Sequence, residues 1–184
     1  MILPMAHQTG SRAGDADGAE LAARAALLAG LDSAVERLLA AAAANPSADA
    51  VDDSWAVRDV VGHVTFWHES FARNVDDLVH ARRPTPLRGR LSDLDKRGVA
   101  EAGAVPLDAI VDRLRGAHAT IRASILSPTL GLIPYRVGSR SYTPSEHLEV
   151  VRHHIRAHAR SLERASDLGR RRTGRSVRDV GAGA

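Results

Sequence analysis

Cysteine is absent from the 184 residues, and aromatic residues make up only 3% of them. The lack of cysteine excludes disulfide bonds, thiolate zinc sites and a cysteine nucleophile, so any thiol chemistry needs a thiol from outside the protein. Hydrophobic residues nevertheless account for 44% of the chain, which is enough for one domain with a core. Much of this content is alanine, and alanine with leucine and arginine favours helix. We therefore expect an all-α fold.

Long apolar runs and lysine are also scarce. No apolar run approaches the roughly 18 residues that a membrane-spanning helix needs. The opening MILPMAHQTG has neither the charged start nor the apolar length of a signal peptide, so a cytoplasmic protein without membrane contact is expected. Lys96 is the only lysine, and the net charge is just +3. The arginine run at 170–172 lacks neighbouring aromatic residues and any base-reading motif, so no nucleic-acid partner is expected.

Hydrophobic periodicity predicts four long helices. Leucine and valine recur at three- and four-residue steps in the segments expected to be helical, which are 18–44, 56–81, 107–125 and 143–165. The fourth helix opens with a capping box, in which Thr143 is the N-cap, Pro144 the first helical residue and Glu146 its partner at N3. Residues 87–106 are less regular, with room for one short helix.

This organisation predicts a single four-helix bundle over residues 18–165. Residues 1–17 are small and polar with scattered glycines, which is typical of a disordered arm. Residues 166–184 lack periodicity and are expected to form a flexible basic tail. The sequence does not fix an oligomeric state, and a homodimer through a helix face is compatible with it.

Histidines on the fourth helix divide between two faces. At 100° per residue, His154 and His158 fall together at one margin of the apolar stripe, whereas His153 falls on the solvent side. Glu149 and His153 have the same four-residue spacing, but they face water. His147 lies on the same side as His154 but two turns away. The separation, on the order of 10 Å, is too large for the two residues to share a metal. His147 is expected to be a partly buried polar residue or to line the mouth of a cleft.

The second helix carries one histidine at the border of its apolar stripe. His63 lies there, and Asp59, Ser70 and Asn74 are the polar residues near it. His68 is expected to point to solvent. Two helices thus bring imidazoles to their buried borders, and His154 and His158 have the i, i+4 spacing that lets two rings reach one ion. The competing interpretation is chance, because histidine pairs at this spacing arise easily on helices.

These residues resemble the DinB/YfiT-like superfamily of four-helix bundles. The resemblance rests on WAVRDVVGHVTFW, with HHIRAHARSL about ninety residues later, and spans about residues 20–165. Its phrasing is similar to the ClbS/DfsB-type branch, as is the connecting IPYRVGSRSYTPSEHL. One departure is Ala56, where family members often have a serine or threonine N-cap; this weakens the helix start by about 1 kcal/mol.

The resemblance implies a divalent metal, with zinc or nickel favoured, held by His63, His154 and His158. It implies an enzyme that activates water or an external low-molecular-weight thiol against an electrophilic small molecule. Two alternatives stay open. Members of the ClbS-type branch are thought to work as self-resistance hydrolases without a metal, and the bundle could also bind a small molecule without catalysis.

Several other residues have two interpretations each. Asp59 could orient the ring of His63 or simply stabilise the N-terminus of its helix, and both roles can hold at once. Trp67 is expected in the core, with a pocket wall as the alternative, and Trp55 is expected to be a hydrophobic staple. His118 is expected to be a hydrogen-bonded core histidine. Tyr142, just before the cap, is a pocket candidate whose competing role is on the surface.

Overall fold

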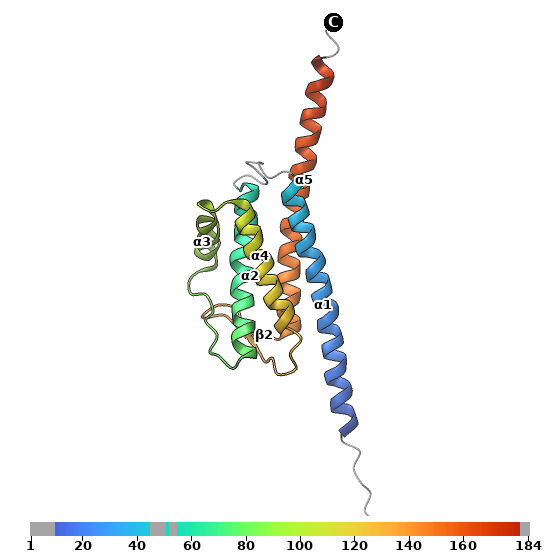
Figure 1. Ribbon diagram of the computed structural model, residues 1–184, viewed down its shortest axis with the longest axis vertical. Helices are drawn as coiled ribbons and strands as arrows, with labels where there is room; N and C mark the ends of the chain where they lie inside the picture. Colours follow the sequence, from blue (N-terminus) through green and yellow to red (C-terminus); the bar gives the residue numbers. More distant parts are fainter. Residues whose placement is uncertain (1–9, 45–50, 52–54, 181–184) are drawn as a thin grey trace, which may run out of the picture.

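The computed structural model describes residues 10–44, 51 and 55–180. Within them are five helices and one short antiparallel ribbon. The elements are α1 (Gly10–Ala44), α2 (Val57–Val79), α3 (Leu91–Gly103), α4 (Leu107–Ser124), β1 (Ile133–Pro134), β2 (Ser141–Tyr142) and α5 (Pro144–Val180). Figure 1 shows α1, α2, α4 and α5 as a bundle of roughly parallel axes, with the shorter α3 on the outer side of α2. The predicted all-α four-helix bundle is confirmed.

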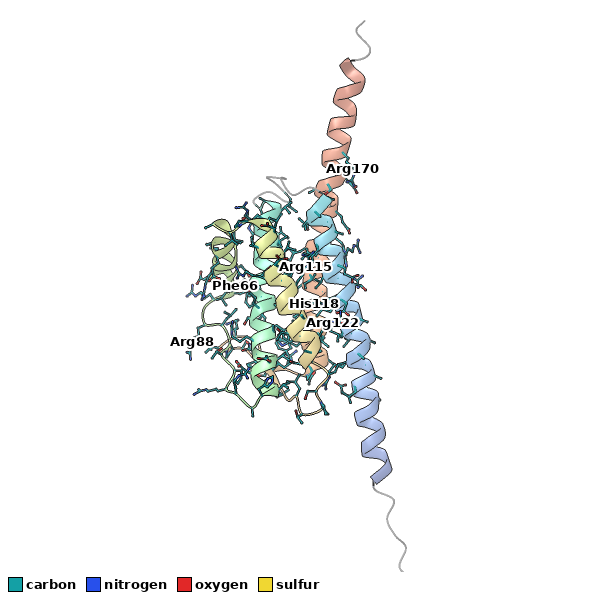
Figure 2. The ribbon with its side chains drawn as sticks, viewed as in Figure 1. Phe66, Arg88, Arg115, His118, Arg122 and Arg170 are labelled. Carbon is teal, nitrogen blue, oxygen red and sulfur yellow. The ribbon has the colours of Figure 1, made fainter. Side chains whose placement is uncertain are left out.

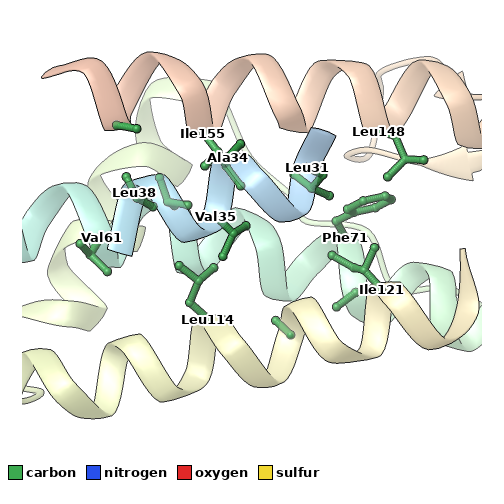
Figure 3. Packing of buried hydrophobic residues seen from close by; sticks show 14 of the residues in the cluster. Leu31, Ala34, Val35, Leu38, Val61, Phe71, Leu114, Ile121, Leu148 and Ile155 are labelled. Atoms are coloured by element: carbon green, nitrogen blue, oxygen red, sulfur yellow. The ribbon is translucent and has the colours of Figure 1, made fainter. Parts of the chain in front are cut away.

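The bundle is built from two helix pairs, α1 with α5 and α2 with α4. Their apolar stripes meet in one core, which Figure 3 shows from close by. Leu31 and Leu38 of α1, Leu114 of α4 and Ile155 of α5 are almost completely buried there. Because the long helices bury apolar residues at three- and four-residue spacing, that spacing in the sequence was a sufficient guide to the core.

Helix α3 packs closely on α2 because small residues line the crossing. A Cβ atom at Gly62 of α2 would lie 2.2 Å from the Cβ of Ala102 in α3, and one at Gly98 would lie 3.0 Å from the Cβ of Phe66. The glycines therefore allow the two backbones to approach. The short helix for which the sequence left room in 87–106 is α3, and it covers a face of α2 that the prediction had left to solvent.

The capping box of α5 forms as predicted. The Thr143 backbone N–H donates to Glu146 Oε2 over 2.9 Å, and the Glu146 N–H donates to Thr143 Oγ over 3.2 Å. Before it, β1 and β2 pair Ile133 with Tyr142 and Pro134 with Ser141. This ribbon lies in the connection that the sequence predicted to be a loop, and it fixes the entry of the chain into α5.

Helix continues further at both ends than the sequence predicted. The prediction placed a disordered arm at 1–17 and a flexible tail at 166–184, but α1 begins at Gly10 and α5 runs to Val180. The added turns carry no apolar stripe, so periodicity could not detect them, and the helix propensity of alanine and arginine accounts for them. Residues 1–9 and 181–184 lie outside the described residues. None of the helices in the described part of the chain combines the length and apolar character needed to cross a membrane.

Candidate metal centre

Three histidines from two helices meet inside the bundle. His63 Nε2 of α2 lies 2.9 Å from His154 Nε2 of α5, and His158 Nε2 lies 3.1 Å from the same atom. One ligand nitrogen from each ring lies within 4.8 Å of the others. The structure thus brings together the three histidines that the sequence selected. The helical spacing of His154 and His158 and the antiparallel position of α2 produce this convergence.

The spacing of these nitrogens fits a divalent ion. Two nitrogens bound to one tetrahedral zinc at 2.0–2.1 Å would lie about 3.3 Å apart. The two distances from His154 Nε2, 2.9 and 3.1 Å, are close to this value. A neutral imidazole nitrogen has a single in-plane lone pair or a single N–H. His154 Nε2 faces two other ring nitrogens, so it can hydrogen-bond well to only one of them. A shared cation would satisfy all three, and the residues present fit such a group.

Burial keeps the rings of His63 and His154 neutral. It lowers the pKa of His63 to about 3 and that of His154 to about 4, and the neighbouring imidazoles lower both further in the same direction. The cause is desolvation, because the charged imidazolium loses its hydration inside the bundle. A neutral ring has the free lone pair that a metal requires, so the cluster is ready to bind a cation at neutral pH.

Asp95 of α3 is the carboxylate next to His63. Its Oδ1 lies 3.6 Å from His63 Nδ1, beyond hydrogen-bond length, and accepts a hydrogen bond from Trp67 Nε1 over 3.0 Å. Asp59 was the residue predicted for this position, but its Oδ2 accepts the backbone N–H of Ala56 over 2.9 Å at the start of α2. The helix-start interpretation of Asp59 is the one the structure shows.

Trp55 also belongs to the cluster, which the sequence did not suggest. Its ring centroid lies 4.9 Å from that of His63. It stacks on His158 with centroids 6.1 Å apart and planes 13° apart. The predicted hydrophobic staple is therefore a wall of the histidine cluster. The motif with tryptophan eight residues before a histidine was the available signal.

A cavity of about 320 Å³ adjoins the histidines. Its lining comes mainly from α2 and α5 and includes His63 and His154 together with the predicted candidates Trp67, Ser70, Asn74 and His147. Leu91 of α3 and Val150 of α5, both substantially exposed, also line it and mark its open side. His147 is 2% exposed, so it is more deeply buried than expected, and its ring stacks on Phe71 at 4.1 Å.

Tyr142 lies behind the cavity wall. Its ring centroid is 5.5 Å from that of His147, and the Arg140 guanidinium lies 4.0 Å above it on the other side. Tyr142 does not line the cavity itself and contacts a residue that does. Tyr142 is therefore not a cavity-lining residue, but it supports one through its contact with His147.

A second histidine pair crosses the bundle beside the cavity. His68 Nε2 lies 3.1 Å from His118 Nδ1, and His118 Nε2 lies 2.8 Å from Asp32 Oδ1 of α1. Figure 2 labels His118 and Arg122 on α4, toward α1. His118 is the hydrogen-bonded core histidine predicted. The prediction for His68 was wrong: it is 1% exposed, because α2 is covered by α3, α4 and α5 and has no broad solvent face.

His153, by contrast, is on the surface as predicted. Its side chain is 62% exposed, and Nε2 lies 3.4 Å from Glu149 Oε1. The four-residue spacing of Glu149 and His153 therefore produces a solvent-facing contact and not a metal site. This pair makes His153 a matched control for the buried histidines on the same helix.

Comparison with known families gives one result. Residues 52–128 match the model of the mycothiol maleylpyruvate isomerase N-terminal domain. The match covers less than half of the chain, including α2, α3 and α4, and therefore His63 and Asp95, but not the two histidines of α5. No curated protein and no solved structure matches the chain.

This family typically binds a divalent metal, in agreement with the histidine cluster. The ClbS/DfsB-type branch stays a prediction, since the match is to a different family of the same superfamily. The matched domain is itself a DinB/YfiT-like four-helix bundle, so the match and the fold confirm the resemblance of this chain to that superfamily.

Proposed function

We propose that the protein is a metal-dependent enzyme in which His63, His154 and His158 hold a divalent ion, with zinc or nickel favoured. A single observation carries the proposal: one imidazole nitrogen from each of three histidines, on two helices, lies within 4.8 Å of the others beside a cavity. An ion bound by three neutral ligands keeps its full double charge, so it would lower the pKa of a bound water or thiol.

The reaction we infer is attack by water or by an external low-molecular-weight thiol on an electrophilic small molecule. The chain has no cysteine, so a thiol nucleophile has to come from outside. The name of the matched family includes mycothiol, which supports the thiol version of the reaction. The residues around the cluster have positioning roles: Trp55 packs against two of the rings, and Asp95 sits beside His63 Nδ1. A carboxylate there favours the tautomer with its proton on Nδ1, which leaves Nε2 as the ligand atom.

The test is the metal content of protein purified without added metal, together with its thermal stability after zinc or nickel is added. We expect close to one ion per chain, and a stabilisation of about 2.7 kcal/mol when the free metal is a hundredfold above its Kd. His63→Ala and His154→Ala should abolish both effects. His153→Ala is the control, because it removes an exposed histidine from the same helix as His154. A folded, metal-free protein whose stability does not respond to either metal would refute the proposal.

A metal-independent hydrolase is the second candidate, and the pair of His63 with Asp95 favours it. A histidine beside a carboxylate can act as a general base for water. In that case Asp95→Asn and His63→Ala would abolish turnover of a hydrolysable electrophile while elemental analysis finds no metal. A bundle that binds a small molecule without catalysis would instead show binding and no turnover with either nucleophile.

A further inference from the structure

The cavity beside the histidines is lined by residues with buried polar atoms that have no hydrogen-bond partner in the described part of the chain. Six buried side-chain nitrogen or oxygen atoms among the described residues lack a hydrogen bond, and five of them belong to residues that line this cavity. They are His63 Nδ1, His68 Nδ1, Ser70 Oγ, Asn74 Oδ1 and His147 Nδ1. Leaving such a group unpaired inside the protein is unfavourable, because it loses its hydrogen bonds to water without replacement. Their concentration in one place indicates a site built to meet polar atoms of a ligand.

Two of these atoms can only accept hydrogen bonds. Asn74 Nδ2 donates to the Pro134 carbonyl over 3.1 Å, so the free end of its amide is the oxygen. For His68, the position of its proton follows from its neighbour His118. Asp32 Oδ1 can only accept a hydrogen bond, so the proton of His118 must lie on Nε2.

The position of the proton on His118 also fixes that on His68, which lines the cavity. Burial lowers the pKa of both His68 and His118, so both rings are neutral. The unprotonated Nδ1 of His118 then accepts the N–H of His68 Nε2, which leaves His68 Nδ1 as a bare acceptor. A ligand that satisfies His68 and Asn74 must supply two hydrogen-bond donors.

The charge of the protein lining disfavours anions. Among the described residues, no arginine or lysine lines the cavity, and Asp95 is the one charged residue that does. Lys96, the only lysine, lines a separate and more open hollow on the other side of Asp95. A carboxylate in the cavity would meet acceptor atoms and a negative charge without a protein cation to compensate, and burying an unpaired charge is strongly unfavourable.

Two stacked ring pairs line the cavity. Trp67 stacks on Tyr135 with ring centroids 5.1 Å apart, and Phe71 stacks on His147 with planes 20° apart. Two stacked pairs favour a planar ligand, which can pack against ring faces. The volume, about 320 Å³, is at the small end of the range for small-molecule sites, about 300–1,000 Å³.

We propose that the part of this cavity around His68 and Asn74 selects a planar, uncharged electrophile bearing hydroxyl or N–H donors, and that it rejects carboxylates such as the maleylpyruvate named in the matched family. The donors bind His68 Nδ1 and Asn74 Oδ1, with Ser70 between them along α2. The proposal rests on the proposed function in taking the ligand to be its substrate. The selectivity of the cavity can, however, be measured without the reaction.

The experiment uses full-length protein treated with a chelator, because a metal could itself bind a carboxylate. The probes are 4-hydroxybenzamide, its acid counterpart 4-hydroxybenzoate, and 4-methoxy-N,N-dimethylbenzamide, the methylated amide without hydrogen-bond donors. Each is titrated to millimolar concentration. Binding is followed by NMR through the indole N–H of Trp67 and the side-chain amide of Asn74. We expect the amide to bind at least about tenfold more tightly than either of the other probes.

One variant and its control test where the ligand binds. Asn74→Leu should weaken amide binding about tenfold and reduce the preference over the dimethylated probe, whereas Ser33→Ala, an exposed serine of α1, should change nothing. Equal or tighter binding of the carboxylate would overturn the proposal, as would the absence of any shift at Trp67 with all three probes. Metal content is measured on the same preparation before chelation. Amide selectivity in a protein that never binds metal would refute the proposed function and leave this inference standing.

Discussion

The close approach of α2 and α3 can be tested by adding one methyl group. In Gly62→Ala the new Cβ would lie 2.2 Å from the Cβ of Ala102, whereas two carbon atoms in contact normally lie about 3.5–4.0 Å apart. Neither atom is at the end of a flexible side chain, so the helices must separate by about 1.3 Å or more. Ala102 is 2% exposed, and the displacement would open a buried interface.

The effect of Gly62→Ala on the free energy of unfolding is the sum of two opposing terms. Replacing a glycine inside a helix by alanine stabilises the helix by about 1 kcal/mol. Overpacking of a rigid, well-packed contact costs about 1–3 kcal/mol, and the depth of this overlap favours the upper part of that range. We therefore expect Gly62→Ala to lower the free energy of unfolding by about 1–2 kcal/mol. For a protein of this size the melting temperature should fall by about 2–4 °C per kcal/mol.

The control is a glycine with room around it. A Cβ at Gly116 of α4 meets nothing within 4 Å, so Gly116→Ala should raise stability by up to about 1 kcal/mol. Adding Ala102→Gly to Gly62→Ala removes the clashing methyl group and should recover stability relative to the sum of the single changes. Urea unfolding of the wild type, of Gly62→Ala, Gly116→Ala and Ala102→Gly, and of the double variant gives all the values needed. A Gly62→Ala protein as stable as Gly116→Ala would refute the packing described for α2 and α3.

Two further predictions concern acid stability and the start of α5. Burial holds the pKa of His147 at about 4 against an ordinary value of 6.5, so the unfolded chain alone takes up this proton as the pH falls below 6.5. Stability should therefore drop by about 1.4 kcal/mol per pH unit from this residue between pH 6.5 and 4. His147→Phe should remove this part of the pH dependence of stability, whereas His153→Phe should not. Urea unfolding at several pH values measures it, and the same dependence of stability on pH in His147→Phe as in the wild type would contradict the prediction. Thr143→Ala should cost about 1 kcal/mol through loss of the cap, measured by thermal unfolding, and an unchanged melting temperature would show that the capping bond is not formed in solution.

The sequence was sufficient where a feature depends on one helix. The stripes of the long helices, the capping box at Thr143 and the shared face of His154 and His158 follow from spacing alone. The position of His63 at the border of its stripe was enough to select it with them. Each of these features needs only the geometry of a single helix, which the sequence specifies directly.

Features that depend on how helices meet could not be predicted. Asp95 lies in a segment of weak periodicity, and nothing in its surroundings along the chain connects it to His63, which is 32 positions away. The burial of His68 was missed because a helical projection assumes one buried face, whereas α2 is covered on several sides. The role of Trp55 at the cluster likewise depends on the position of α5, from which His158 reaches it.

The small size of α3 has a consequence for the dynamics of the site. This helix has 13 residues and buries only Leu94, Gly98 and Ala102, so it has the least apolar contact with which to resist local opening. Each detachment of α3 would take Asp95 away from His63 and from the indole of Trp67. Hydrogen exchange of the α3 amides and the tautomeric balance of the His63 ring should therefore report the same opening equilibrium, although the two lie on different helices.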